Sequence, residues 1–317
     1  MKRINLEGYI HDIIQRKITT YHVEVRQHGE VVGKFDWRDN RRDNIHSVSK
    51  SFVSMAVGIA VHEGVLRLDE KPAEIWPEKL PRNPAPNLLK MTVRDAIMMA
   101  CGHDYFILEG YSGKPGVPGR DELENDDWIQ YAMTFDVPYT PGTYWKYNNF
   151  GPYLCSVLIQ DRTGQRLRDY LMPRLFQPLG IRNPQWFEAA AGGYTLGCGG
   201  LHLSTAELSR FGQLLVNKGE WEGQQLIPAA WVEEATAFQI SNDVGDPVGP
   251  DKKAGYGYFF WRCARDNAYR GYGWGGQYVI VLPEQDACVA IMSHDFDDQG
   301  IMDCVWDNIV PQLKENA

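Results

Sequence analysis

The sequence predicts an α+β fold, in which one antiparallel sheet built from both ends of the chain is covered by helices. Strand-like alternation of apolar and polar residues occurs near residues 21–35 and returns after residue 255, whereas the middle of the chain shows helical pieces between proline-rich connections. One sheet that uses both termini, with a mostly helical region inserted, is the economical arrangement of these elements. We therefore expect a single domain over residues 1–317, with an α/β part (1–66 plus 205–317) and a mainly helical part (67–204).

The N-terminal elements follow from periodicity and turn residues. Residues 5–17 have the pattern of an amphipathic helix, and the stretch YHVEVRQHGEVVGKF alternates around His28-Gly29, which indicates a hairpin. An apolar segment then runs from Ser47 to Gly64 with apolar residues on every face, which predicts a helix buried on all sides.

Helical periodicity, a capping box and strand alternation predict the elements of the rest of the chain. The stretches TVRDAIMMA and FGPYLCSVLIQDRT are helical, and in LSTAELSRFGQLLVNKG a capping box of Ser204 and Glu207 opens a helix. Loop 111–128 is long and acidic, so it is either a functional lid or a solvated excursion. The C-terminal third predicts two hairpins, GYGYFFWRC with NAYRGYGWGG and QYVIVL with ACVAIM, and a last helix from about Asp298.

Charge and composition exclude several classes of protein. The net charge is −9 and the sequence pI about 5.4, which argues against nucleic-acid and anionic-membrane partners because both require basic patches. No apolar run reaches the ~20 residues that span a bilayer, so we expect a cytoplasmic protein. The six cysteines lack CxxC spacing and are expected to be buried free thiols, and the eight histidines form no metal motif. We expect neither cofactor nor metal, and the oligomeric state stays open.

Ser47 and Lys50 stand three residues apart where the apolar helix begins, so they share one helix face. Two interpretations are open. In the first, Ser47 caps the helix and Lys50 faces solvent. In the second, Ser47 is a nucleophile and Lys50 its base, which requires a dry setting because a solvated ammonium has no lone pair to offer. The apolar surroundings of Lys50 favour the second interpretation.

Two further stretches carry polar chemistry. In PGTYWKYNNFGPYLCSVL, Tyr147 and Asn149 stand directly before a helical run; a phenol near a cation can relay a proton, and a carboxamide can orient a carbonyl. The alternative is that Tyr147 packs and Asn149 caps the helix. In GYGWGGQYVIVLPE, glycines flank Trp274 before a strand, so the backbone can approach a ligand closely; the alternative is a hairpin kink.

Together, SVSK, then YNN about a hundred residues later, then a glycine-rich stretch before a C-terminal hairpin resemble the serine β-lactamase and penicillin-binding-protein superfamily. The resemblance is to its class C-like branch, with family VIII carboxylesterases, nylon-oligomer hydrolases and D-peptidases. It implies a β-lactamase-like fold, Ser47 as the acylated nucleophile, and Lys50 and Tyr147 as the proton-transfer pair. It also implies that Asn149 orients the substrate and that the N–H groups of Ser47 and Trp274 form an oxyanion hole.

The third motif departs from the family pattern. Relatives that act on β-lactams carry K-T-G or H-x-G there, whereas this chain reads GYGWGG and has no such cation. Esterase or amidase action on a small-molecule ester or amide is therefore expected. A true β-lactamase, a D-amino-acid peptidase and a non-catalytic binding module are the alternatives, and Lys146 or Arg270 is a possible replacement cation. The expected substrate-binding residues are Asn149, Gly273, Trp274, Gly275, Tyr105, Trp145 and Tyr272.

Overall fold

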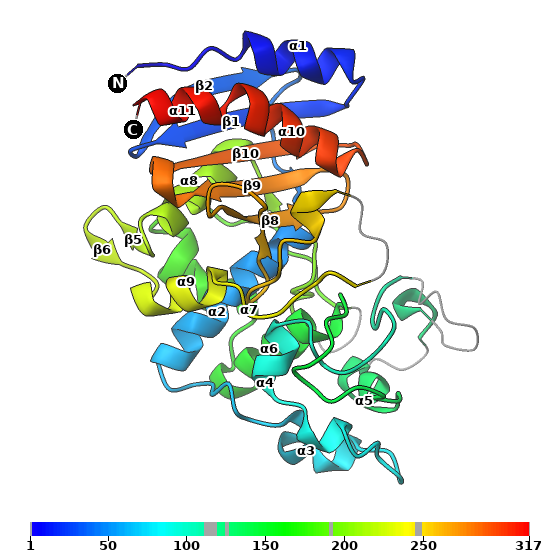
Figure 1. Ribbon diagram of the computed structural model, residues 1–317. Coiled ribbons are helices and arrows are strands. Elements are labelled where there is room, and N and C mark those ends of the chain that lie inside the picture. Colours follow the sequence, from blue (N-terminus) through cyan, green and yellow to red (C-terminus); the bar gives the residue numbers. More distant parts are fainter. Residues whose placement is uncertain (1, 111–118, 124–126, 190–192, 245–248, 317) are drawn as a thin grey trace.

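The computed structural model describes residues 2–110, 119–123, 127–189, 193–244 and 249–316. Its centre is a six-stranded antiparallel sheet in the order β2-β1-β10-β9-β8-β7 (Figure 1). The N-terminal hairpin thus lies beside the last strand of the chain, in agreement with the predicted sheet built from both termini. The strands are β1 (Thr20–Gln27), β2 (Glu30–Asp36), β7 (Trp261–Arg262), β8 (Tyr269–Gly273), β9 (Gln277–Leu282) and β10 (Ala287–Ser293).

Both faces of the central strands β9 and β10 are buried, whereas the edge strand β2 is largely exposed. In β9, Tyr278, Ile280 and Leu282 belong to a core cluster shared with three terminal helices. Val279 and Val281 alternate with them and join a larger cluster on the opposite face. This period of two follows from the pleat of a strand. The terminal helices are α1 (Glu7–Gln15), α10 (Asp298–Asn308) and α11 (Val310–Asn316), which lie together on one face in Figure 1.

Helix α2 (Ser49–His62) lies on the other face of the sheet and passes into the helical part of the molecule (Figure 1). Every residue from Ser49 to Ala60 is buried, as its apolar periodicity predicted. It packs against β8 on the sheet side and against α6 (Phe150–Thr163) and α9 (Ala229–Thr236) elsewhere. Helix α8 (Thr205–Val216) covers the same face of the sheet and begins with the predicted Ser204–Glu207 capping box.

The regular elements of the inserted part up to residue 176 are helices and single turns, all short except α6, and much of the chain between them forms neither helix nor strand. The prediction was right about α6, whereas TVRDAIMMA forms only the five-residue α4. Its elements are α3 (Pro72–Ile75), η2 (Pro77–Lys79), η3 (Leu88–Lys90), α4 (Val93–Ile97), η4 (Arg120–Glu122), α5 (Trp128–Met133), α6, α7 (Leu167–Leu171) and the π-helical turn η5 (Met172–Phe176). Most of the predicted loop 111–128 lies outside the described residues.

The remaining elements are small. Strand β3 (Asp43–Asn44) pairs with β4 (His202–Leu203), β5 (Glu220–Trp221) pairs with β6 (Gln224–Gln225), and η6 (Pro250–Lys252) and η7 (Pro283–Gln285) are single turns. The turn at η7 joins β9 to β10, which confirms the second C-terminal hairpin. The first hairpin is shorter than predicted. Its strand β7 comprises only two residues, and the preceding GYGYFF forms neither helix nor strand. All six cysteines are free and buried.

Candidate active site

Ser47 lies in the 3₁₀ turn η1 (His46–Val48), which leads directly into α2. The residue at the N-cap of α2 is Val48, and no side chain caps this end. The Ser47 hydroxyl instead accepts a hydrogen bond from Lys50 Nζ at 2.9 Å. Lys50 is only 1% exposed. The interpretation of a capping serine with a solvent-facing lysine is therefore wrong.

The Lys50 ammonium is held on three sides. Besides Ser47, its Nζ donates to the carbonyl oxygen of Cys198 at 2.8 Å and lies 4.8 Å from the ring centroid of Tyr147. In the described part of the chain no carboxylate pairs with it. In its neutral form a lysine amine has a lone pair that can accept the proton of a neighbouring hydroxyl.

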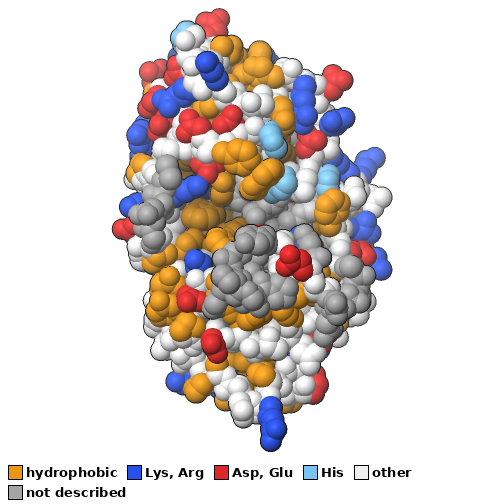
Figure 2. All heavy atoms as spheres, turned by 90° about the vertical axis from the view of Figure 1, so that its right-hand side faces the viewer, with side chains coloured by type: hydrophobic (Ala, Val, Ile, Leu, Met, Phe, Trp, Pro, Cys, Tyr) orange, Lys and Arg blue, Asp and Glu red, His pale blue; other side chains and the backbone are white. Residues whose placement is uncertain are grey.

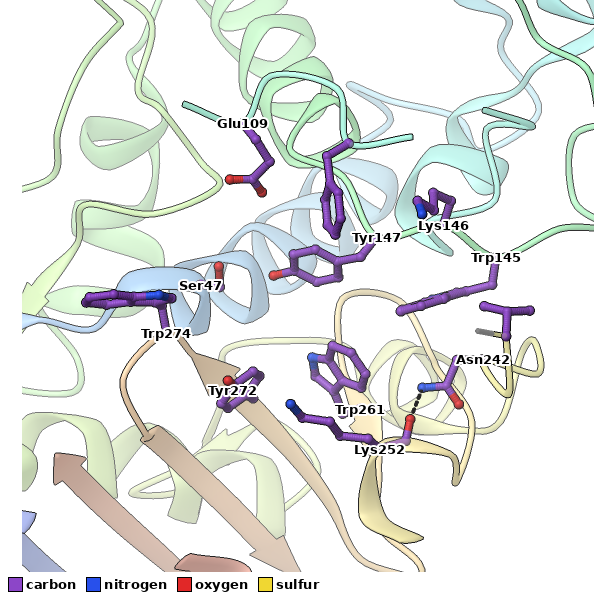
Figure 3. A pocket seen from close by; sticks show the side chains of 12 residues that line it. Ser47, Glu109, Trp145, Lys146, Tyr147, Asn242, Lys252, Trp261, Tyr272 and Trp274 are labelled. Carbon is purple, nitrogen blue, oxygen red and sulfur yellow. Dashed lines mark hydrogen bonds between the residues drawn. The ribbon is translucent and has the colours of Figure 1, made fainter. Parts of the chain in front are cut away.

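Tyr147 lies just before α6, and its hydroxyl points toward Ser47 (Figure 3). Its ring stacks on Trp261 with the centroids 5.8 Å apart. Asn148 accepts a hydrogen bond from the N–H of Gly151 at the start of α6. The neighbouring Asn149 is buried, and its Nδ2 donates to the carbonyl oxygen of Leu108 at 3.1 Å. Asn149 therefore ties a neighbouring loop to the site.

The glycine-rich stretch brings strand β8 against the serine. A Cβ atom on Gly273 would lie 2.4 Å from the carbonyl oxygen of Ile45 and 3.1 Å from the nitrogen of Ser47, so only glycine fits this approach. The chain then turns through Trp274 and Gly275, which has a φ of +75°. In the described part of the chain, neither the Ser47 N–H nor the Trp274 N–H donates a hydrogen bond.

These residues border a cavity of about 900 Å³. Five of the predicted residues line it: Ser47, Trp145, Tyr147, Tyr272 and Trp274. Tyr105 is not in the lining and packs against His103 and Phe135. The other predicted residues outside the lining are Lys50, Asn149, Gly273 and Gly275. Lys146 lines the cavity as well. Six further lining residues were not predicted from the sequence: Phe106, Glu109, Asn242, Val244, Lys252 and Trp261.

The cavity has cations other than those of a K-T-G motif. Lys146 borders it, with Nζ 5.1 Å from the ring centroid of Phe106. Arg270 does not, because its buried guanidinium donates to the carbonyl oxygens of Arg262 and Asp251. The suggestion that Arg270 is a pocket cation is therefore wrong. Lys252 also lines the wall, and its Nζ pairs with Asp298 at 2.6 Å.

Aromatic and histidine side chains surround the exposed indole of Trp274, which is 52% accessible. Its ring centroid is 5.3 Å from His46, 5.4 Å from His294 and 5.0 Å from Phe296. Figure 2 shows histidine side chains next to hydrophobic ones on this face. Burial lowers the pKa of His46, and nearby His202, His294 and Lys50 lower it further, so His46 is neutral at pH 7.

Asp298 forms a polar network with two residues of the cavity wall, Tyr272 and Lys252. Asp298 accepts hydrogen bonds from the hydroxyls of Tyr272 at 2.9 Å and Tyr278 at 3.2 Å, besides its ion pair with Lys252. Burial raises the pKa of Tyr272, and Asp298 raises it further, so the phenol stays a neutral donor. The network fixes one wall of the cavity.

The described residues contain no group of three or more histidine, cysteine or acidic side chains placed to hold a metal ion. None of the helices they form has the length and apolarity needed to cross a membrane.

An antiparallel sheet between terminal and central helices, with Ser-x-x-Lys at the head of the central helix, defines the class of serine β-lactamases and penicillin-binding proteins. The Beta-lactamase family model matches residues 7–309, and the chain belongs to this family. A curated relative is esterase EstB of Burkholderia gladioli, 28% identical over 177 residues. That match covers 50% of this chain and 45% of EstB, less than half of the esterase.

Solved structures agree on the fold. A penicillin-binding-protein homologue from Caulobacter crescentus superimposes with a TM-score of 0.71 at 16% identity, covering 98% of this chain and 99% of that one. A family VIII carboxylesterase gives a TM-score of 0.69 at 15% identity, covering 94% of this chain and 96% of that one. At these identities the likeness establishes the β-lactamase-like fold.

Proposed function

We propose that this protein is a serine hydrolase that cleaves a small-molecule ester or amide through an acyl-enzyme on Ser47. The observation that carries the proposal is the 2.9 Å contact between Ser47 Oγ and a buried Lys50 Nζ at the wall of a cavity of about 900 Å³. Membership of the Beta-lactamase family and the partial match to an esterase support the same reaction class.

In the first half-reaction, a neutral Lys50 amine takes the proton of the Ser47 hydroxyl while Oγ attacks the substrate carbonyl. In this step Nζ keeps donating to the Cys198 carbonyl oxygen while its lone pair takes the Ser47 hydrogen, so the direction of the Nζ–Oγ hydrogen bond is reversed. The Ser47 and Trp274 N–H groups are the proposed donors to the tetrahedral oxyanion. Tyr147, whose hydroxyl points toward Ser47, gives its proton to the leaving group and takes the Ser47 proton over from Lys50, so that both groups return to their starting protonation states (Figure 3).

In the second half-reaction, water attacks the acyl-enzyme, and Lys50 with Tyr147 accepts its proton. The carboxylic acid leaves and Ser47 regains its hydrogen, so the cycle closes without a cofactor. Asn149 is proposed as a positioning residue, because it is hydrogen-bonded to the 107–108 backbone and not exposed on the cavity wall.

The composition of the wall supports esters and amides over β-lactams. The third motif presents Tyr272, Gly273 and Trp274 and no cation. Of the two lysines on the wall, Lys252 is paired with Asp298, and Lys146 lies by Phe106, on the other side of Tyr147 from Ser47 (Figure 3). We therefore expect slow nitrocefin turnover compared with turnover of p-nitrophenyl esters. Fast nitrocefin turnover, or release of terminal D-alanine from peptides, would favour the β-lactamase or D-peptidase alternative.

The test is intact-mass analysis after incubation with a fluorophosphonate, together with turnover of p-nitrophenyl acetate and butyrate. Wild type should gain one adduct and hydrolyse the esters, and Ser47→Ala should lose both. Ser54→Ala is the matched control, since Ser54 lies in the same helix and its buried hydroxyl has no hydrogen-bond partner in the described structure. An unlabelled, inert wild type at pH 7–9 would leave the non-catalytic binding module as the better interpretation.

A further inference from the structure

The cavity contains one acidic side chain that the proposed reaction does not use. Glu109 lines the wall, and within the described residues its carboxylate makes neither a hydrogen bond nor an ion pair. In Figure 3 it lies on the same side of Tyr147 as Ser47, whereas Lys146 lies on the other side. A carboxylate on the wall of a pocket lined by apolar rings, without an ion-pair partner among the described residues, is an unusual feature, although Lys50 and Arg120 also act on the nearby Cys198 thiol.

The backbone around Glu109 is held in place. The N–H of Asn149 donates to the carbonyl oxygen of Ile107 at 3.0 Å, and its side chain donates to that of Leu108 at 3.1 Å. The carbonyl oxygen of Glu109 accepts from the N–H of Arg120 at 2.6 Å. These three hydrogen bonds fix the direction of the segment, so the carboxylate is presented to the cavity by a supported backbone.

The Glu109 carboxylate also contributes to the electrostatic field at Cys198, next to the Ser47–Lys50 pair. Burial raises the pKa of the Cys198 thiol, Lys50 and Arg120 lower it, and Glu109 raises it. Cys198 is the residue whose carbonyl oxygen holds the Lys50 amine, so Glu109 acts on the same region as the proposed catalytic pair. The two cations of the wall act elsewhere, because Lys252 pairs with Asp298 and Lys146 lies by Phe106.

Aromatic rings complete the environment. Trp274 and Tyr147 border the cavity on either side of Ser47 in Figure 3, and Phe106 joins the same wall. A cation is attracted to the faces of such rings and to a nearby carboxylate, and both attractions strengthen where water is excluded. A quaternary or primary ammonium fits this combination, whereas an anionic group at the same place would face the Glu109 charge.

We infer that Glu109 selects esters or amides that carry an ammonium group close to the scissile bond. This inference rests on the proposed hydrolase function and names its substrate class. It makes Glu109 a specificity-determining residue, which acts on substrate charge and takes no part in proton transfer at Ser47.

Two pairs of isosteric esters test it. Acetylthiocholine and 3,3-dimethylbutyl thioacetate differ only by the charge of the leaving group. The p-nitrophenyl esters of 4-(trimethylammonio)butanoate and 5,5-dimethylhexanoate differ only by the charge of the acyl group. Wild type should prefer the cationic member of at least one pair by about ten-fold in kcat/KM. Glu109→Gln should reduce this preference to within about two-fold, by a loss on the cationic members that exceeds any change on the neutral ones.

Lys146→Met is the control, because it removes the opposite charge from the same cavity and should keep or increase the preference for the cationic ester. As an independent readout, tetramethylammonium should inhibit hydrolysis of p-nitrophenyl butyrate competitively in wild type and about ten-fold more weakly in Glu109→Gln. No preference in wild type, or an equal loss on both members of each pair in Glu109→Gln, would overturn the inference.

The substrate class and the hydrolase function can be refuted separately. A wild type that is labelled by the fluorophosphonate at Ser47 but prefers the neutral esters refutes the substrate class and leaves the hydrolase standing. A wild type that is neither labelled nor active on any of the four esters refutes the proposed function and this inference with it.

Discussion

Gly273 packs directly against the backbone of Ser47. A Cβ atom at position 273 would come within 2.4 Å of the Ile45 carbonyl oxygen and 3.1 Å of the Ser47 nitrogen. The end of strand β8 and the start of the central helix are thus in van der Waals contact where the proposed chemistry takes place. This contact explains why a glycine-rich stretch at the C-terminal end of the chain belongs to the same site as Ser47.

The first prediction concerns this contact. Gly273→Ala should lower kcat for p-nitrophenyl butyrate by at least about ten-fold, because the added methyl group must displace the 45–47 backbone and with it the Ser47 N–H and Oγ. Steady-state kinetics and thermal unfolding would check it. In Gly199→Ala the new methyl group would lie 3.7 Å from the His46 carbonyl oxygen, an ordinary contact, so this variant should keep its kcat. Equal activity in the two variants would contradict the prediction.

The second prediction concerns Lys50. Lys50→Met should lower kcat/KM by about 10²–10⁴-fold, the usual contribution of a general base. Its thermal stability should stay close to that of wild type, because a methionine of similar length replaces a buried amine that has no carboxylate partner in the described structure. Activity assays and differential scanning calorimetry on the same preparation would separate the two effects. A stable variant with full activity would exclude Lys50 as the base.

Part of this site could be predicted from the sequence because local geometry dictates it. Positions 47 and 50 share a helix face whatever the tertiary structure, and the apolar run around them predicts burial. The hairpins β1–β2 and β9–β10 follow from alternation around turn residues, and the α8 capping box follows from its spacing. The motif resemblance placed Tyr147 and Trp274 beside Ser47, and the structure brings them to the same cavity.

The rest of the wall comes from segments without periodicity. Glu109 and Asn242 lie in irregular loops and Lys252 in a single 3₁₀ turn, so no pattern in the sequence shows which way their side chains point. The prediction of Tyr105 as a substrate-binding residue pointed to the right loop, but the residues of that loop that line the cavity are Phe106 and Glu109. The prediction for Arg270 was wrong because the alternation of a strand indicates the face on which a side chain lies. It does not indicate which carbonyl oxygens accept hydrogen bonds from the guanidinium.

The third prediction concerns the network below the cavity. Asp298→Asn should lower the free energy of unfolding by about 1–3 kcal/mol, because the Lys252 ammonium loses its partner while the tyrosine hydroxyls keep an acceptor. It should change KM more than kcat, since the network touches the wall and not Ser47. Chemical denaturation and steady-state kinetics would measure both.

Asp307→Asn is the control for that substitution. Asp307 makes an exposed ion pair with Arg265 at 3.7 Å, and such pairs contribute between about 0 and 1 kcal/mol. If Asp298→Asn no longer lowers the free energy of unfolding once Lys252→Met is also present, the ion pair accounts for the effect. A change in kcat alone would show that the network acts on the chemical step instead.

The last prediction concerns acid stability. Burial by itself would raise the pKa of Glu207, but the hydrogen bonds from Arg42 and Ser204 outweigh it and hold the pKa below its ordinary value of 4.5. A carboxylate with a lowered pKa in the folded state stabilises the protein above the unfolded-state pKa, and this contribution is lost as the pH falls through the folded-state value.

Glu207→Gln should therefore be less stable than wild type by an amount that is constant above about pH 5.5 and shrinks below about pH 4.5. Thermal unfolding from pH 3 to pH 7 would measure this difference, and Glu220→Gln, at an exposed position in β5, should show a small difference that does not vary with pH. A gap between Glu207→Gln and wild type that widens toward acid pH would have the wrong sign for a stabilising carboxylate at the start of α8.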